Sequence, residues 1–240
     1  MVQLLVNTTK PFPKNEDSMY VKLLLTPYLL LVFFLPSSGQ EYSYAETTNN
    51  KTTNVQIKKS QPEAGMYLIE MKDEHRLSYH YTMLKGSTVR WQHTDTDLSH
   101  DFKVERTGND IVIRGTFKGN HINKTVEIDD AHWYSKVDHA LSDWVRSDEE
   151  ELDFWILKLS SDLDPLKISA EKVGTETIWL ADNTFQAVKV KLTLCGFFLS
   201  KLWSSYYWYR KEDGLFLKFK GAIGKPGTPT TTIELTHCAK

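Results

Sequence analysis

The part of this chain that most constrains its fold is the segment 199–235, because its turn residues encode a β-hairpin and a further strand. Residues 203–211 are aromatic and strand-like, and Asp213 with Gly214 supplies the positive φ that a tight hairpin requires. Residues 215–220 then alternate between the two faces of a returning strand, one of which is apolar. This segment therefore predicts an antiparallel sheet.

A loop rich in glycine and proline follows the hairpin. Its rigid backbone cannot carry a ladder of hydrogen bonds, and the β-branched residues 230–236 then resume as a strand. We expect this last strand to close or edge the sheet. The loop contains Gly221, Gly224, Pro226, Gly227 and Pro229.

Strand-like segments separated by turn residues continue through most of the upstream chain. Turn signals recur about every 8 to 12 residues, which is typical of a sandwich, a barrel or a strongly curved sheet. Short turns make consecutive strands pair antiparallel. The expected strands are 66–71, 75–84, 88–94, 101–106, 111–118, 121–128, 166–173, 176–180 and 185–195.

One segment interrupts the β pattern and predicts a single helix over 135–146. Ser135 with Asp138 three residues later resembles a capping box. Apolar residues recur after it at helical spacing on one face, namely Val137, Leu141, Trp144 and Val145.

The N-terminal residues predict export. Residues 1–18 are polar, and we expect them to be an over-extended start, with the true start at Met19. Residues 19–39 have the pattern of a secretory signal peptide: a short charged region, an apolar run over 23–35 and small residues before cleavage after Gly39. The expected location is therefore periplasmic or secreted.

The mature chain is expected to begin with a flexible leader. Residues 40–64 are mostly Thr, Asn, Gln, Ser and Lys, and a single folded domain is predicted over 65–240. No cysteine follows the apolar run, so we expect no lipoprotein anchor. The run is shorter than the roughly 20 apolar residues of a membrane span, and Pro27 interrupts it, so we expect no permanent membrane span.

Charge argues against a nucleic-acid partner. The chain has 29 Lys and Arg against 31 Asp and Glu, which gives a formal net charge of −2. Binding to a phosphate backbone depends on a concentration of positive charge that this balance does not indicate.

The sequence also lacks the motifs of the common enzyme classes. There is no GxSxG, no GxxxxGK[ST] and no GxGxxG after a strand, and the adjacent acids Glu149–Glu151 are expected to be solvated. The 8 histidines are scattered without an HxH or HExxH arrangement. We therefore expect a protein that is not an enzyme and that has no cofactor and no metal site.

The two cysteines leave two alternatives open. Cys195 and Cys238 are too few and too far apart in the chain for a zinc site of paired thiolates. They either form a disulfide in an oxidising compartment or remain thiols, and the sequence does not distinguish these outcomes.

The most unusual feature is the density of aromatic residues between Trp203 and Tyr209. One interpretation is a strand that is covered on both faces by a filled core. The other is an apolar groove for a lipid or another hydrophobic ligand, because ligand pockets are largely aromatic and apolar. The residues predicted to line such a groove are Trp144, Phe154, Trp155, Trp203, Tyr207, Trp208 and Tyr209.

The segment 153–235 resembles a family of uncharacterised secreted proteins of Gram-negative bacteria, a domain of unknown function. The shared parts are the aromatic strand, the hairpin at Asp213-Gly214 and the GxPGTP loop. The resemblance implies a fold similar to the LolA and LolB lipoprotein carriers, but it implies no catalytic residue and no lipoprotein shuttling. The positions that match are Trp203, Trp208, Arg210, Asp213, Gly214, Gly224, Gly227 and Pro229.

Together these features predict a mainly β protein with a single curved antiparallel sheet, a half-barrel, and one helix in the concave face. The expected function is noncatalytic binding of a lipid or another hydrophobic small molecule. The alternative is a cell-envelope protein with a closed core whose sheet edge or Gly-Pro loop binds another protein.

Overall fold

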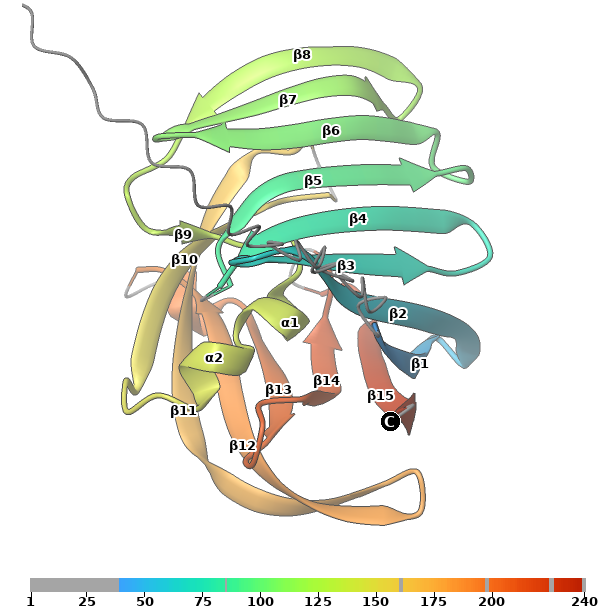
Figure 1. Cartoon of the computed structure of the whole chain (residues 1–240), viewed down its shortest axis with the longest axis vertical. Helices are drawn as coiled ribbons and strands as arrows, with labels where there is room; N and C mark the ends of the chain where they lie inside the picture. Colours follow the sequence, from blue (N-terminus) through green and yellow to red (C-terminus); the bar gives the residue numbers. More distant parts are fainter. Residues whose placement is uncertain (1–38, 85, 160–161, 197–198, 225–226, 239–240) are drawn as a thin grey trace, which may run out of the picture. The chain divides into compact units, whose positions relative to one another are not determined.

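The computed structural model describes residues 39–84, 86–159, 162–196, 199–224 and 227–238. The expected start at Met19 and the expected signal peptide lie outside these residues. The described chain forms one sheet of 15 strands with few helices (Figure 1).

The strands follow one another through the sheet almost in chain order. The order is β8-β7-β6-β5-β4-β3-β2-β1-β15-β14-β13-β12-β11-β10-β9. Most neighbours are consecutive in the chain and pair antiparallel because short turns connect them, β1 and β15 also pair antiparallel, and among the described strands β9 and β10 alone pair parallel. The strands are β1 Gln40–Thr48, β2 Lys51–Glu63, β3 Met66–Lys72, β4 Arg76–Met83, β5 Thr88–Asp95, β6 His100–Thr107, β7 Asp110–Phe117, β8 Asn120–Glu127, β9 His132–Trp133, β10 Glu151–Leu157, β11 Pro165–Leu180, β12 Asn183–Leu194, β13 Ser204–Arg210, β14 Phe216–Ala222 and β15 Thr230–Cys238.

The prediction of a mainly β, antiparallel sheet is confirmed, and so is the hairpin that organises its C-terminal part. β13 and β14 pair on either side of Asp213 and Gly214, and Gly214 has a φ of 72°. Asp213 accepts hydrogen bonds from the Arg210 guanidinium and from the Leu215 backbone N–H at 3.1 Å, which fixes the turn. The sequence identified this element because its signal is local.

The predicted flexible leader over 40–64 is wrong. Residues 40–48 and 51–63 are β1 and β2, and their inward side chains are buried, including Tyr44, Val55 and Ile57. Few residues here are apolar, but those few alternate with polar ones, and this period-two pattern forms a half-buried strand.

The strands β1 and β2 also decide between the two expected positions of the last strand, which were to close or to edge the sheet. β15 does not edge the sheet, because it pairs with β14 on one side and with β1 on the other. The pairing of β1 with β15 joins the N-terminal and C-terminal halves of the described chain into one sheet.

The predicted helix over 135–146 is two separate single turns, α1 Val137–Ala140 and α2 Ser142–Val145. The expected capping box does not form: Lys136 occupies the N-cap position without a side-chain cap, and the Asp138 carboxylate instead pairs with the Lys136 ammonium at 2.8 Å. The helical spacing was nevertheless informative, because the predicted apolar side chains Leu141, Trp144 and Val145 are buried.

Two hydrophobic cores hold the sheet in its curvature. The larger core joins α1 and α2 to the inner faces of β1–β3 and β10–β15. The smaller core joins β5–β7 to β9 and β10 through residues such as Trp91, Ile113 and Trp133. Lys124 on β8 also forms an ion pair with Asp164 at 3.0 Å, so the two ends of the strand order approach each other without pairing. Among the described residues, no helix has the length and apolar character that a membrane crossing needs.

Two glycines allow the helical segment to lie directly on the sheet connections. A Cβ at Gly86 would lie 2.3 Å from the Ala140 carbonyl oxygen, and a Cβ at Gly214 would lie 2.3 Å from the Ser142 carbonyl oxygen. Both glycines also have positive φ values of 85° and 72°. The backbone of α1 and α2 therefore contacts the β4–β5 and β13–β14 turns with no room for a side chain.

We expect the substitution Gly214→Ala to destabilise the protein more than Gly65→Ala. Gly65 has a similar φ of 84° but nothing within 4 Å of its Cβ position. The substitution Gly65→Ala therefore has only the cost of placing a non-glycine residue at a positive φ. Gly214→Ala must also displace the helical segment, and the two losses in free energy of unfolding should differ by about 2 kcal/mol. Urea denaturation followed by tryptophan fluorescence measures both, and equal losses would show that the close approach is unimportant.

Candidate functional site

The interior face of β4, β5 and β6 is unusually polar. The buried side chains of these strands include Ser78 and His80 on β4, His93 and Asp95 on β5, and His100 on β6. The register places Ser78 opposite His93, and Asp95 opposite His100. Alternation along each strand therefore gathers these groups on one face of three adjacent strands.

This polar face borders an interior cavity of about 270 Å³. One part of its wall is apolar and comes from β1–β3, β5, β15 and three connections between strands, whereas the other part carries polar groups of β1, of β4–β6 and of residues 135–138. The apolar lining residues are Tyr44, Val55, Ile57, Met71, Trp91, Leu98, Leu159, Ile223 and Ile233. The polar lining residues are Glu46, Arg76, Ser78, His80, His93, Asp95, His100, Ser135, Lys136 and Asp138.

Hydrogen bonds connect the cavity wall to the chain that enters α1. The Ser135 hydroxyl lies 2.8 Å from His80 Nδ1 and 3.1 Å from the Thr88 hydroxyl. The Ser135 backbone N–H also donates to Thr88 Oγ1 at 3.0 Å. Burial and the nearby Lys136 charge lower the pKa of His80 well below its usual value, so its ring is neutral at neutral pH.

Four of the charged groups in the wall form ion pairs with each other. Lys136 and Asp138 form an ion pair at 2.8 Å, and the Lys136 charge holds the pKa of Asp138 below its usual value although burial opposes this. The Arg76 guanidinium binds Glu46 at 2.8 Å and also pairs with Asp73. Buried charges require such partners, because an unpaired ion in a low-dielectric interior is very unfavourable.

His93, Asp95 and His100 form a tight cluster in this wall. Each offers one possible ligand atom, and these atoms lie within 4.8 Å of one another. His93 Nδ1 lies 2.6 Å from the Ser78 hydroxyl, and the Leu98 backbone N–H donates to Asp95 Oδ1 at 2.9 Å. Burial, reinforced by His100, lowers the pKa of His93 to about 4, and burial also lowers the pKa of His100.

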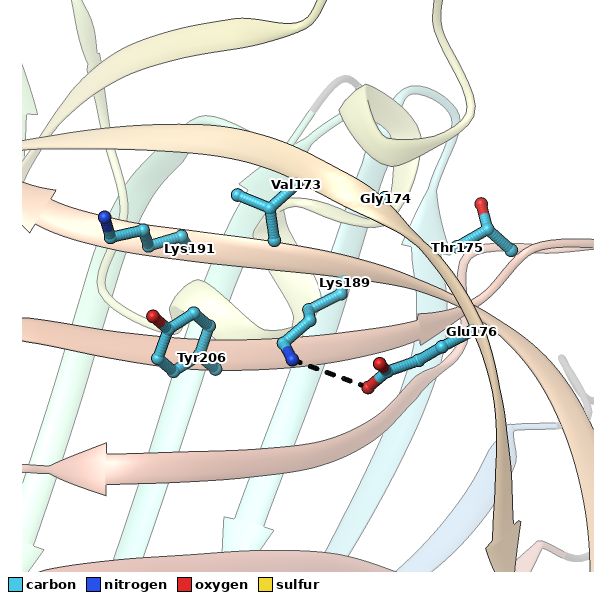
Figure 2. Close-up of a pocket in the computed structure, with 7 residues that line it drawn as sticks. All are labelled: Val173, Gly174, Thr175, Glu176, Lys189, Lys191 and Tyr206. Atoms are coloured by element: carbon cyan, nitrogen blue, oxygen red, sulfur yellow. Dashed lines mark ion pairs between the residues drawn. The ribbon is translucent and has the colours of Figure 1, made fainter.

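A second hollow, of about 420 Å³, lies where β11, β12 and β13 are adjacent (Figure 2). It is lined by Glu176, Lys189, Lys191 and Tyr206 beside an irregularity in the pairing of β11 at Gly174. Figure 2 shows Lys189 directed at Glu176, with which it pairs at 3.7 Å. The lining residues are not buried, so this hollow lacks the desolvated polar groups that distinguish the interior cavity.

The aromatic residues that the sequence singled out are placed in the cores. Trp144, Phe154, Trp208 and Tyr209 are buried members of the larger core. Trp203 and Tyr207 pack against that core and Trp155 against the smaller one. Among the described residues, this set lines neither of the two hollows.

Both faces of β13 are covered, as the filled-core interpretation expects. Tyr207 and Tyr209 stack at 6.3 Å and contact Phe216 on the inner face, and the Tyr209 hydroxyl donates to the Val137 carbonyl at 3.3 Å. On the outer face, the Trp208 indole N–H donates to Glu176.

The positions of the family resemblance are mainly structural. Arg210, Asp213 and Gly214 build the β13–β14 turn. Gly227 has a φ of 87°, and Gly224 and Pro229 lie in the same loop, of which residues 225–226 fall outside the described chain.

The alternative of a Cys195–Cys238 disulfide is not what the structure has: both residues are thiols. Cys195 directly follows β12 and Cys238 ends β15, and β13 and β14 lie between these two strands. Three strand spacings of about 4.8 Å exceed the roughly 7 Å limit for bridged Cα atoms. Burial, with a further contribution from Asp153, raises the pKa of Cys195 to about 11. Its thiol is therefore protonated at neutral pH and unreactive.

Sequence reasoning missed the polar cavity. The predicted strands that carry it are correct, but the outer residues of β4, Leu77, Tyr79 and Tyr81, are more apolar than the inner residues Ser78 and His80. One signal was available in the sequence. His93 and Asp95 are two residues apart on one predicted strand and so share a face, and His100 lies near the start of the next strand of the same hairpin.

Comparisons with known proteins show a fold and no family. No protein-family model matches the sequence, and no curated protein matches it. The structure is similar to a β-barrel-like protein of a domain of unknown function, DUF1849, from Brucella abortus, with a TM-score of 0.58 and 8% identity over 83% of this chain and 96% of that chain. The hypothetical lipoprotein YmcC from Escherichia coli is more distant, with a TM-score of 0.44 and 11% identity over 86% of each chain.

The likeness to the Brucella protein shows that the described sheet has a β-barrel-like fold. This likeness does not test the expected similarity to the LolA and LolB carriers, which stays a prediction.

His139 is a buried histidine that should make stability depend on pH. It contacts the rings of Tyr42 and Tyr44 at 6.2 and 6.4 Å, and its Nε2 has no hydrogen-bond partner among the described residues. Burial lowers its pKa to about 4, with Asp138 acting in the opposite direction and Lys136 and Lys59 in the same direction.

We expect acidification to weaken the folded state partly through His139. Because the folded pKa is below the unfolded value of about 6.5, the unfolded chain binds more protons between these values, and stability falls as the pH is lowered through this window. The substitution His139→Phe should reduce the loss of unfolding free energy between pH 7.5 and pH 5 by about 2 kcal/mol. Urea denaturation at both pH values tests this, with the exposed His132→Gln as control. An unchanged loss in His139→Phe would contradict the assignment.

Proposed function

We propose that this chain is an exported, noncatalytic binding protein that holds a small amphiphilic ligand in its interior cavity, with the helical segment 135–146 lying in the concave face of the sheet. Export rests on the signal-peptide pattern of residues 19–39. The observation that carries the ligand proposal is the two-sided wall of the cavity.

The apolar side of the wall suits a short hydrocarbon group. Tyr44, Val55 and Ile57 are buried side chains with surfaces facing the cavity, where an alkyl group would replace water. The volume of about 270 Å³ is just below the roughly 300–1,000 Å³ of most small-molecule pockets. The ligand class is therefore a short-chain amphiphile rather than a large lipid.

The polar side of the wall suits a hydrogen-bonding head group. His80 Nε2 is buried and has no hydrogen-bond partner among the described residues. A ring nitrogen of this kind can donate a hydrogen bond to a bound ligand or accept one from it. The paired charges of Lys136 with Asp138 and of Arg76 with Glu46 add fixed dipoles nearby.

The rim of the cavity is apolar and exposed. Leu98, Leu159 and Ile223 come from three separate connections, yet all three line the same cavity. They are 57%, 39% and 60% exposed. Single exposed apolar side chains are common, but a group of them around one cavity is the kind of patch that marks a binding site. An apolar rim favours capture of a ligand with a hydrocarbon part.

The noncatalytic part of the proposal has its own test. The cavity contains two serine–histidine contacts, Ser78 with His93 and Ser135 with His80, and such contacts also activate nucleophiles in hydrolases. We expect no turnover of p-nitrophenyl butyrate above background. Turnover that disappears in Ser78→Ala or Ser135→Ala would make the protein an esterase instead.

The alternative of protein docking at a sheet edge receives no support from strand β8. Every second residue of this edge strand is exposed, and Lys124 within it is held in an ion pair with Asp164. Charged residues on an edge strand discourage pairing with another chain.

We expect rim substitutions to weaken binding of a short-chain fatty acid, which a change in tryptophan fluorescence reports because Trp91 lines the cavity. Ile223→Asp and Leu98→Asp each replace an exposed apolar contact with a charge, so the fold is retained while affinity falls by about ten-fold, the equivalent of about 1.4 kcal/mol. Trp179→Asp is the matched control, because Trp179 is 69% exposed but does not line the cavity. Fluorescence titration measures the affinities. Unchanged affinity in both rim variants, or no binding by the parent chain, would contradict the proposal.

A further inference from the structure

We propose that His93, Asp95 and His100 form a binding site for a divalent transition-metal ion. Their possible ligand atoms lie within 4.8 Å of one another, and all three residues are buried. This inference goes beyond the proposed ligand function and does not depend on it, because it concerns the metal ion alone.

The ligands come from rigid elements. His93 and Asp95 are two residues apart on β5 and therefore point to the same face, and the antiparallel register places His100 of β6 directly opposite Asp95. A site carried by two paired strands keeps its geometry better than one on mobile loops. Donor atoms bound to one zinc ion at about 2.0–2.1 Å lie about 3.3 Å apart, so side-chain adjustments of the order of 1 Å close the cluster.

His100 provides the observation that points to a missing ligand. Both of its ring nitrogens are buried, and neither has a hydrogen-bond partner among the described residues. Buried polar atoms in native proteins are nearly always satisfied, so two unsatisfied nitrogens on one ring require an explanation. The ring is stacked on Phe117 at 4.4 Å between centroids and tilted against Phe102 at 6.0 Å, which leaves it little freedom to find another partner.

Neighbouring groups orient the other two ligands. The Ser78 hydroxyl lies 2.6 Å from His93 Nδ1, and when Nδ1–H donates a hydrogen bond to that hydroxyl the Nε2 lone pair is left for a metal ion. The Leu98 backbone N–H binds Asp95 Oδ1, which leaves Oδ2. Hydrogen bonds of this kind hold metal ligands in their binding orientation in established sites.

The donor set selects the class of metal. Two imidazoles and one carboxylate suit Zn²⁺ and its first-row neighbours, whereas Ca²⁺ and Mg²⁺ prefer oxygen ligands alone. Structural zinc sites use four protein ligands, but sites with three keep a position for an exchangeable ligand. Because His93, Asp95 and His100 all line the interior cavity, that position would face the cavity.

The test is a metal titration of the chain after treatment with a chelator. We expect isothermal titration with Zn²⁺ to show one site per chain, and Co²⁺ to give a visible absorption band of a low-coordinate site. Asp95→Asn preserves shape and His100→Phe preserves the stack on Phe117, and each should weaken Zn²⁺ binding at least 100-fold. A spectrum without a Co²⁺ band or a titration without one-to-one binding would overturn the proposal.

His80→Gln is the matched control for these variants. His80 is a buried histidine of the same cavity that lies outside the cluster, so its replacement should change Zn²⁺ affinity by less than three-fold. An equal loss in His80→Gln would move the site away from the proposed residues and overturn the assignment. Thermal unfolding gives a second measurement: Zn²⁺ should raise the Tm of the parent chain and of His80→Gln, but not that of Asp95→Asn.

Discussion

The close approach of segment 135–146 to the sheet determines both the core and the cavity. Its backbone rests on Gly86 and Gly214, where even a methyl group would meet a carbonyl oxygen at 2.3 Å. From this contact inward, Leu141, Trp144 and Val145 fill the space above the sheet as part of the larger core. At the Ser135 end of the segment, apolar packing gives way to hydrogen bonds of Ser135 with His80 and Thr88. The cavity therefore lies where the apolar part of this segment stops.

Burying polar groups in the interior costs free energy, and neighbouring groups reduce this cost. The buried His80 remains neutral, and the buried Asp138 is paired with Lys136 at 2.8 Å. Two separate apolar cores on either side supply the burial that offsets this cost. Departures from an apolar interior of this kind concentrate at functional sites, which is why the cavity, rather than the aromatic strand, carries the functional proposals.

Local signals made the C-terminal sheet predictable, and the absence of local signals explains the errors elsewhere. The hairpin at Asp213-Gly214 was predicted correctly because the two turn residues determine it. The segment 40–64 has the composition of a leader, because its few apolar residues, such as Tyr44, Val55 and Ile57, are visible only as an alternation with polar ones. The helix was predicted at the right apolar residues but with the wrong length, because the Lys136–Asp138 pair replaces the expected cap.

The candidate site could not be predicted, because the sequence does not say which face of a strand is inside. On β4 the residues that look like core, Tyr79 and Tyr81, face outward, and Arg90 covers Tyr81 at 3.7 Å from its ring centre. His80 faces inward only because segment 135–146 and the curvature of the sheet cover that side. Once the inner face is known, His93 and His100 on one hairpin become neighbours without any conventional motif. A site of this kind depends on a single hairpin, so its ligands can change while the rest of the sheet keeps its structure.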